Sequence, residues 1–193
     1  LALGYRSRAA FKLVQLDQKL RFLRAGGRAL ELGAAPGSWT QVLVERKLET
    51  FALDELPMEP VPGASFVQGS LIDAAATAQL LLLLGDEPVD LVLSDISPAR
   101  SGHRSLDSAR LTSLLLQVLY LARRTLRPGG SVLMKALQGE DHQQLLRALR
   151  SFSSVSAHKP AASRKESAEL YLYADRFDPA RFDAAAPALL HLG

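Results

Sequence analysis

Two charged residues stand where the sequence otherwise predicts buried β-strands. Lys135 lies inside the apolar run SVLMKAL, and Asp95 ends the apolar run VDLVLSD. Lysine is almost never fully buried without a partner, so the two could form a buried ion pair, or the amine of Lys135 could reach water at a strand end. Together they could instead handle a proton, because a lysine can act as a general base when its pKa falls from about 10.4. Burial and a second ammonium group would lower that pKa, and Lys12 is our candidate for this second cation.

A glycine-rich turn follows another apolar run. The stretch LELGAAPGSW, residues 30–39, ends a predicted strand and begins a helix. Gly33 and Gly37 would let the backbone approach a ligand, because they carry no Cβ. Asp54 ends the next predicted strand, where a carboxylate can accept hydrogen bonds from a ribose diol. These features indicate a nucleoside-containing ligand, with a purely structural turn as the alternative.

The turn lacks two glycines of the dinucleotide-binding pattern, which argues against a dinucleotide as its ligand. The dinucleotide-binding pattern G-x-G-x-x-G needs glycines where Ala35 and Ser38 stand, and Pro36 removes an N–H group that would bind pyrophosphate. S-adenosylmethionine contains an adenosine and no phosphate, so it fits the turn better. A nicotinamide-dependent oxidoreductase is therefore the weaker hypothesis.

Helices and strands must alternate to bring these residues together. Periodicity and apolar runs predict helices at 7–20, 38–46, 74–84, 107–126 and 140–152, and strands at 29–33, 50–54, 65–69, 89–95, 131–137, 154–160 and 169–174. This alternation predicts an α/β fold with a mostly parallel seven-stranded sheet and helices on both faces. The last two strands are too close in sequence for a parallel crossover, so we expect them to be antiparallel. Ligands bind at the carboxyl ends of the strands in such sheets.

Length and composition limit the class of protein. The chain has 193 residues, of which 48% are hydrophobic, so we expect a single domain spanning 1–193. It has no cysteine, and its four histidines are scattered, so we expect no metal site. The longest apolar run, Leu80 to Leu84, is too short to cross a membrane. Basic residues are concentrated in the predicted helical segment 1–28. They could form a solvated helix face or a surface that contacts phosphate groups. The tail 175–193 shows no periodic pattern.

Six motifs occur in the order found in a known family. They are GYRSRAAFKL, LELGAAPGSW, DELPMEP, LVLSDISP, LRPGGSVLMKALQG and KPAASRKESAELYLYA, and they extend from Gly4 to Ala174. On these motifs the sequence resembles the FtsJ (RrmJ) family of ribose 2′-O-methyltransferases. The resemblance implies a Rossmann-like, S-adenosylmethionine-dependent methyltransferase fold.

The family's catalytic tetrad of Lys, Asp, Lys and Glu matches four residues of this chain. The resemblance implies that four residues catalyse the methylation of an RNA ribose 2′-hydroxyl: Lys12, Asp95, Lys135 and Glu169. It gives the proton-acceptor role to Lys135. The other three would orient the nucleotide and tune that lysine.

Cofactor contacts are expected from the glycine turn and from the strand ends beside it. The expected S-adenosylmethionine contacts are Gly33, Ala35, Pro36, Gly37, Ser38, Trp39, Asp54, Ser70 and Asp95. Without the resemblance we would interpret Trp39 as a core anchor of its helix. Two positions depart from the family: an acid that holds the adenine is usual where Ser70 stands, and Asn is frequent where Ala99 stands.

The resemblance also implies an RNA substrate. We expect methylation of a uridine in large-subunit ribosomal RNA or a pre-ribosomal particle, linked to large-subunit assembly, because SRKESAELY is most similar to the bacterial and mitochondrial ribosomal group. LDQKL and GDEPVDLV also resemble members that act on tRNA anticodon loops, and a non-catalytic rRNA-binding assembly factor is a further alternative. RNA contacts are expected from Arg6, Arg8, Arg100, His103 and Arg104. We expect no membrane partner, a monomer when free, and a mitochondrial location with the bacterial cytoplasm as the alternative.

The connection after the first cofactor helix is unusually short. No Gly, Pro, Asn or Ser stands between Val44 and Phe51, although helix ends of this kind usually carry such a residue. The family has a short Gly-rich connection in this place. We therefore expect a break or a disordered segment between Arg46 and Thr50.

Overall fold

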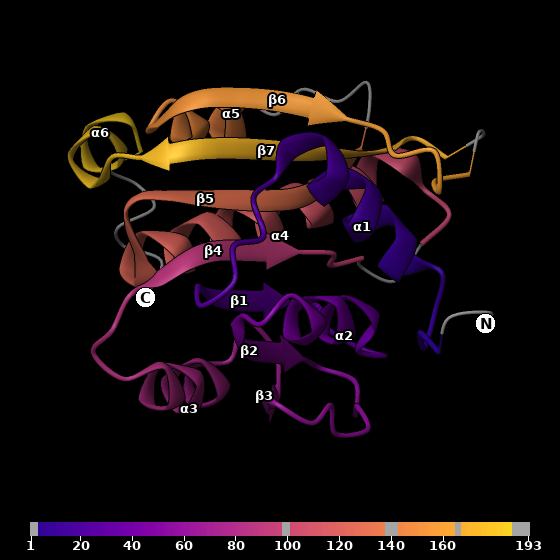
Figure 1. Cartoon of the computed structure of the whole chain (residues 1–193). Coiled ribbons are helices and arrows are strands. Elements are labelled where there is room, and N and C mark those ends of the chain that lie inside the picture. Colours follow the sequence, from indigo (N-terminus) through magenta and orange to yellow (C-terminus); the bar gives the residue numbers. More distant parts are fainter. Residues whose placement is uncertain (1–3, 98–100, 138–142, 165–166, 187–193) are drawn as a thin grey trace.

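Helices and strands alternate along most of the chain, as the sequence predicts (Figure 1). The structure is a computed structural model, and it describes residues 4–97, 101–137, 143–164 and 167–186. The helices are α1 (Ala9–Leu20), α2 (Ser38–Glu45), α3 (Ala74–Leu84), α4 (Arg104–Thr125), α5 (Gln143–Leu149) and α6 (Pro179–Ala185). The strands are β1 (Arg28–Leu32), β2 (Glu49–Asp54), β3 (Ala64–Gln68), β4 (Val89–Ser94), β5 (Leu126–Leu137), β6 (Phe152–His158) and β7 (Glu169–Phe177).

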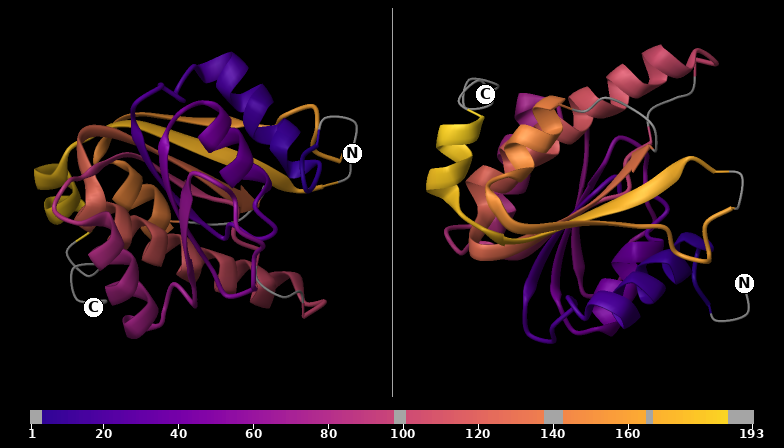
Figure 2. Two further views of the ribbon diagram at one scale, coloured as in Figure 1. Left: turned by 60° about the horizontal axis from the view of Figure 1, so that its bottom comes forward. Right: turned by 90° about the horizontal axis from the view of Figure 1, so that it is seen from above.

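The strands form one seven-stranded sheet in the order β3-β2-β1-β4-β5-β7-β6. The pairs from β3 to β5 are parallel, whereas β7 is antiparallel to both β5 and β6. Figure 2 shows α1 and α2 on one face of the sheet and α3, α4 and α5 on the other. The predicted fold class, including the antiparallel last strand, is confirmed.

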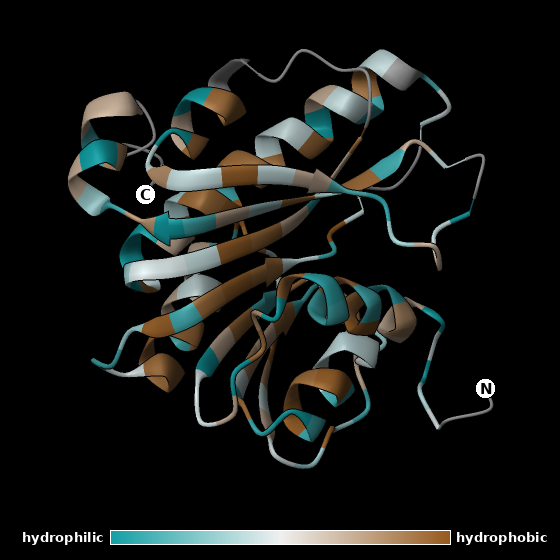
Figure 3. Cartoon of the chain, turned by 45° about the horizontal axis from the view of Figure 1, so that its top comes forward, coloured by the Kyte–Doolittle hydropathy of each residue, from teal (hydrophilic) through white to brown (hydrophobic). Residues whose placement is uncertain are grey.

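Each face of the sheet has its own hydrophobic core, because alternate residues of a strand point to opposite faces. Leu93 and Leu133 pack with Leu13 of α1, while Val92 and Val132 pack with the helices of the other face. In Figure 3, much of the central strands is brown, the colour of hydrophobic residues. Within the described residues, no helix has the length and apolar character that crossing a membrane requires.

Several predicted boundaries differ from the structure at the start of β5 and at the end of α5. The residues of RPGG were predicted to lie outside the neighbouring strand, but β5 begins at Leu126 and includes them. They form a bulge, since Leu126 pairs with Val89 while Ser131 pairs with Leu91. The helix predicted at 140–152 ends at Leu149, and β6 then begins at Phe152.

The tail, for which the sequence predicted no structure, extends β7 and adds helix α6. The Asp178 carboxylate accepts hydrogen bonds from the N–H groups of Ala180 and Arg181, and Pro179 takes the first helical position. Both are signals of a helix start. Phe182 is fully buried, and its ring lies 6.0 Å from that of Phe177. These signals were present in the sequence and were missed.

The expected break between Arg46 and Thr50 is wrong. The chain is continuous there and forms a compact turn between α2 and β2, in which Lys47 has a left-handed backbone with a φ of 62°. The N–H of Lys47 donates to Val44 O, and that of Leu48 to Leu43 O. Lys47 thus adopts the conformation that a glycine usually provides at a helix end.

Candidate active site

The strand register brings Asp95, Lys135 and Tyr171 side by side. Ser94 pairs with Met134, so the residues that follow them, Asp95 and Lys135, are neighbours, and Lys135 pairs with Tyr171 of β7. Because Leu133 faces α1, Lys135 and its partner Tyr171 face α1 as well. The register therefore assembles one row of side chains across three strands, below helix α1.

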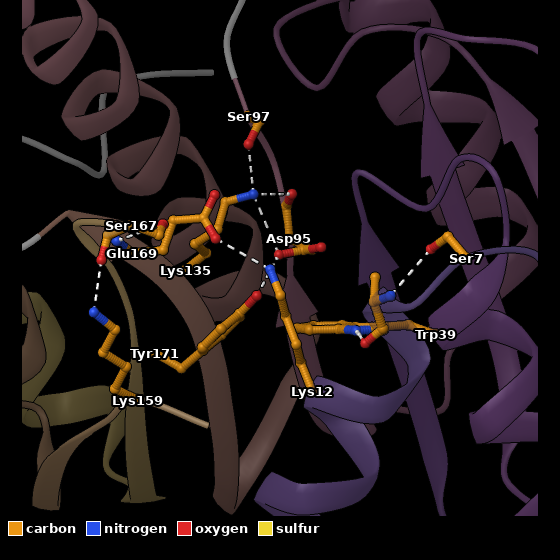
Figure 4. A network of polar contacts seen from close by, with 11 residues as sticks. Ser7, Lys12, Trp39, Asp95, Ser97, Lys135, Lys159, Ser167, Glu169 and Tyr171 are labelled. Atoms are coloured by element: carbon orange, nitrogen blue, oxygen red, sulfur yellow. Dashed lines mark hydrogen bonds and ion pairs between the residues drawn. The ribbon is translucent and has the colours of Figure 1, made fainter. Parts of the chain in front are cut away.

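Lys135, near the carboxyl end of β5, and Asp95, directly after β4, form an ion pair (Figure 4). The Lys135 Nζ lies 3.2 Å from Asp95 Oδ1, and the Lys135 side chain is only 7% exposed. The same amine donates to the backbone carbonyl of Asp95 at 2.8 Å and to Ser97 Oγ at 2.5 Å. A protonated amine has three N–H donors, and these three oxygens engage all of them.

Lys12 and Glu169 form a second ion pair, which closes the cluster from the side of α1. Lys12 Nζ lies 3.1 Å from Glu169 Oε2. Burial raises the pKa of Glu169, but the hydrogen bond and charge of Lys12, together with the charge of Lys135, outweigh it and hold this pKa below its ordinary value. Glu169 is therefore a carboxylate at neutral pH.

Tyr171, which the sequence analysis did not single out, connects the two ion pairs. Its hydroxyl donates to Asp95 Oδ1 at 2.9 Å, and the Lys12 amine lies 5.9 Å from the centre of its ring. Burial, then the charge of Asp95, raise the pKa of the Tyr171 hydroxyl, which stays a donor. The signal was the alternation of ELYLY, which places Tyr171 on the same face of β7 as Glu169.

A pocket of about 480 Å³ lies beside this cluster, at the carboxyl ends of β1, β2 and β4. Asp95 belongs to both the pocket and the cluster. Three other predicted cofactor residues also line the pocket: Gly33, Ala35 and Asp54. A volume of this size suits a small-molecule ligand.

Two glycines of the turn are required by its geometry. Gly33 has a φ of 78°, and a Cβ there would lie 2.9 Å from the backbone nitrogen of Ile96. Gly37 has a φ of 100°, and a Cβ there would lie 2.6 Å from Arg6 Nη1. Both positions combine a left-handed backbone with a close approach, so only glycine fits without strain.

The Asp54 carboxylate fastens the turn to the end of β2. Its Oδ2 accepts from the Ala35 N–H at 2.8 Å, and its Oδ1 accepts from the Leu56 N–H at 2.8 Å. Each carboxylate oxygen can accept a further hydrogen bond. Asp54 therefore shapes the pocket and can still bind a ribose diol.

The other predicted cofactor residues are absent from the lining of this pocket: Pro36, Gly37, Ser38, Trp39 and Ser70. Ser70 follows β3 and donates to Glu55 Oε1, whereas the residues of the turn itself are held from behind. The Pro36 carbonyl accepts from Arg6 Nη1. Ser38 and Trp39 are buried, with the Ser38 hydroxyl donating to Ser7 Oγ and the Trp39 indole donating to the Ala9 carbonyl. Trp39 thus joins α2 to α1, as its interpretation as a core anchor predicted.

Comparison with known proteins shows the family to which the chain belongs. A model of the family described as FtsJ-like methyltransferase matches residues 5–177. The chain belongs to this family. A relative from Granulibacter bethesdensis, named ribosomal RNA large subunit methyltransferase E, is 45% identical over 180 residues, which cover 92% of this chain and 78% of the relative.

Two further comparisons agree with this membership. A protein of the same name from Azoarcus sp. is 47% identical over 173 residues, covering 88% of this chain and 84% of the relative. A crystal structure from Plasmodium falciparum, described as a ribosomal RNA methyltransferase, matches with a TM-score of 0.81 and 31% identity, covering 90% of this chain and 98% of that one.

In this FtsJ-like methyltransferase a buried carboxyl group lies beneath the glycine turn. Glu31 of β1 is 1% exposed, and its Oε2 accepts from the Thr40 hydroxyl at 2.6 Å. Burial raises the pKa of Glu31 to about 8, although the Thr40 hydrogen bond lowers it. Glu31 was not among the predicted site residues. Its place inside the apolar run ALELG was the signal.

The five basic residues that were expected to contact RNA have different environments. Arg8 and His103 are exposed, and Arg104 begins α4. Arg100 lies outside the described residues. Arg6 instead donates to three carbonyl groups, those of Pro36 (2.8 Å), Glu59 (2.6 Å) and Pro60 (2.9 Å). Its guanidinium clamps two loops of the FtsJ-like fold together, which favours a structural role over phosphate binding.

Proposed function

We propose that this protein transfers a methyl group from S-adenosylmethionine to a ribose 2′-hydroxyl, that of a uridine, in large-subunit ribosomal RNA. The observation that carries the proposal is the Lys135–Asp95 pair at the edge of the pocket. A buried amine beside a ligand pocket is suited to removing the proton that a hydroxyl must lose when it is methylated. We propose that the chain acts as one domain and as a monomer when free.

The pocket fits an adenosine-containing methyl donor. Asp54 offers carboxylate oxygens to a ribose diol, and apolar side chains such as Leu53, Leu71 and Ile96 offer a surface for a base. When bound, S-adenosylmethionine supplies an electrophilic methyl group on its sulfur.

Lys135 acts as the proton acceptor in this proposal. Its Nζ, in the uncharged form, would accept the proton of the 2′-hydroxyl as the oxygen gains the methyl group; the bond between that methyl group and the donor sulfur would break, leaving S-adenosylhomocysteine. The ribose hydroxyl replaces one of the three oxygens now bound to the amine. Ser97 itself is exposed, whereas Asp95 is partly buried, so the Ser97 hydroxyl is the partner that is most easily displaced.

The other three charged residues hold the acceptor and the ribose in position. Asp95 fixes the amine of Lys135, and Tyr171 fixes Asp95. Lys12 and Glu169 offer a cation and a carboxylate on the α1 side of the cluster, where a nucleotide would enter. Such positioning supplies much of the rate in enzymes of this kind.

The names of the relatives support ribosomal RNA as the substrate over tRNA. Both curated relatives are named for the large-subunit ribosomal RNA. The complete charged cluster favours an enzyme over a non-catalytic assembly factor. The relatives named ribosomal RNA large subunit methyltransferase E come from bacteria, so the mitochondrial expectation gains no support, and we propose the bacterial cytoplasm.

Mapping of 2′-O-methyl groups tests the proposed function. Large-subunit particles and tRNA from cells that lack the protein are incubated with S-adenosylmethionine and the purified protein. We expect one new 2′-O-methylated uridine in the large-subunit RNA and none in tRNA. Methylation of tRNA alone would favour the anticodon-loop alternative, and methylation of a base would contradict the proposal.

A further inference from the structure

The pocket contains a carboxylate that the proposed mechanism does not use. Glu55 follows Asp54 at the end of β2 and lines the pocket with Leu53 and Leu56. Its Oε1 accepts a hydrogen bond from the Ser70 hydroxyl at 2.6 Å. Among the described residues, no cation pairs with Glu55, so its second oxygen is available to a donor in the pocket.

The segments that carry Glu55 and Ser70 are joined along their length. The Gly69 N–H donates to the Asp54 carbonyl at 2.8 Å, and the Gln68 side-chain amide donates to the Glu55 carbonyl at 3.2 Å. These contacts and the Ser70 hydroxyl fix the side of the pocket on which the Glu55 carboxylate lies. The carboxylate is therefore oriented before any ligand binds.

The surroundings of Glu55 suit the base of a nucleoside. Asp54, on the preceding residue, is placed for the ribose, so a base attached to that ribose extends along the ends of β2 and β3. Leu56 is 64% exposed beside Glu55, and Leu71 lines the same part of the pocket. Apolar groups that cover the faces of a base leave its edge to polar groups, and Glu55 is the charged group at this end.

We infer that Glu55 accepts a hydrogen bond from the exocyclic amino group of the adenine of S-adenosylmethionine, and that Ser70 orients it. The inference rests on the proposed methyl donor. A carboxylate only accepts hydrogen bonds, so it selects the 6-amino group of adenine against the 6-oxo group of hypoxanthine. In this chain the acidic group thus comes from the end of β2, and the serine after β3 takes the supporting role.

Binding of S-adenosylhomocysteine, measured by calorimetry without RNA, tests the inference. The ligand is compared with S-inosylhomocysteine, its 6-oxo analogue. We expect the wild-type protein to bind the adenine form at least about tenfold more tightly, since a charge-assisted hydrogen bond is lost in the analogue. Glu55→Leu should weaken binding of the adenine form about tenfold and abolish the preference. Asp86→Asn, which removes an exposed acid remote from the pocket, should change neither value.

A second variant distinguishes the hydrogen bond from a general effect on the loop. Because Glu55 and Ser70 touch, Ser70→Asp in the Glu55→Leu background returns a carboxylate to the same space. We expect it to restore the preference for adenine. Equal binding of both ligands by the wild-type protein, or a Glu55→Leu variant with unchanged preference, would overturn the inference. Failure of the wild-type protein to bind S-adenosylhomocysteine at all would instead overturn the proposed methyl donor.

Discussion

The hydroxyl of Tyr171 donates to the same oxygen of Asp95 that faces the Lys135 amine, at 2.9 Å and 3.2 Å respectively. Asp95 Oδ1 thus lies between a neutral donor and a cation. A carboxylate bound from two sides has little freedom to rotate, which fixes the amine opposite it. The pair of contacts explains how the sheet holds a lysine in one place beside the pocket.

Replacement of this tyrosine tests its positioning role. Tyr171→Phe keeps the ring contact with Trp39 at 5.7 Å but removes the hydroxyl. We expect kcat to fall about tenfold with the KM for S-adenosylmethionine nearly unchanged, and the free energy of unfolding to fall by about 1 kcal/mol. Steady-state kinetics and chemical denaturation measure the two effects. A loss of stability with an unchanged kcat would assign Tyr171 to the core alone.

Arg6 and Arg8 should differ in what they bind, although both are arginines of one motif. Arg6→Ala removes the clamp on the Pro36 and Pro60 carbonyls, so we expect about tenfold weaker binding of S-adenosylhomocysteine. Arg8→Ala should leave that binding unchanged. It should instead weaken RNA binding and lower the slope of log affinity against log salt by about 1. Calorimetry and filter binding at several salt concentrations measure these values. Identical behaviour of the two variants would contradict the clamp.

The buried Glu31 should make stability depend on pH. Folded Glu31 keeps its proton up to a pKa of about 8, whereas its ordinary value is 4.5. Between these values the folded state binds more protons than the unfolded state, so the contribution of Glu31 to stability falls as the pH rises. Glu31→Gln can still accept from Thr40 and does not titrate. We expect its Tm to exceed that of the wild-type protein by several degrees at pH 8.5 and by less at pH 5.5. An equal difference at both pH values would show that Glu31 does not titrate in this range.

The sheet and the meeting of Asp95 with Lys135 were predictable, because both follow from apolar runs whose ends share one edge of a parallel sheet. The position of Glu169 depended on the antiparallel register of β7, for which the family resemblance was needed. The contacts of Arg6 were not predictable, since its guanidinium binds carbonyl groups of two loops that are distant in sequence. The turn at Lys47 shows that a lysine can replace a glycine where neighbouring strands fix the chain.

Methyl transfer by a Lys135→Met variant tests whether the Lys135 amine accepts the proton of the 2′-hydroxyl. Methionine keeps much of the volume of the side chain and cannot accept the proton. S-adenosylhomocysteine binding, which we expect to stay within about threefold of the wild-type value, shows that the pocket is intact. On large-subunit particles, we expect a single-turnover rate at least about 10³-fold below that of the wild-type protein, the range for loss of a general base. A Lys135→Met rate within tenfold of wild type, with the 2′-hydroxyl still methylated, would contradict this role of Lys135.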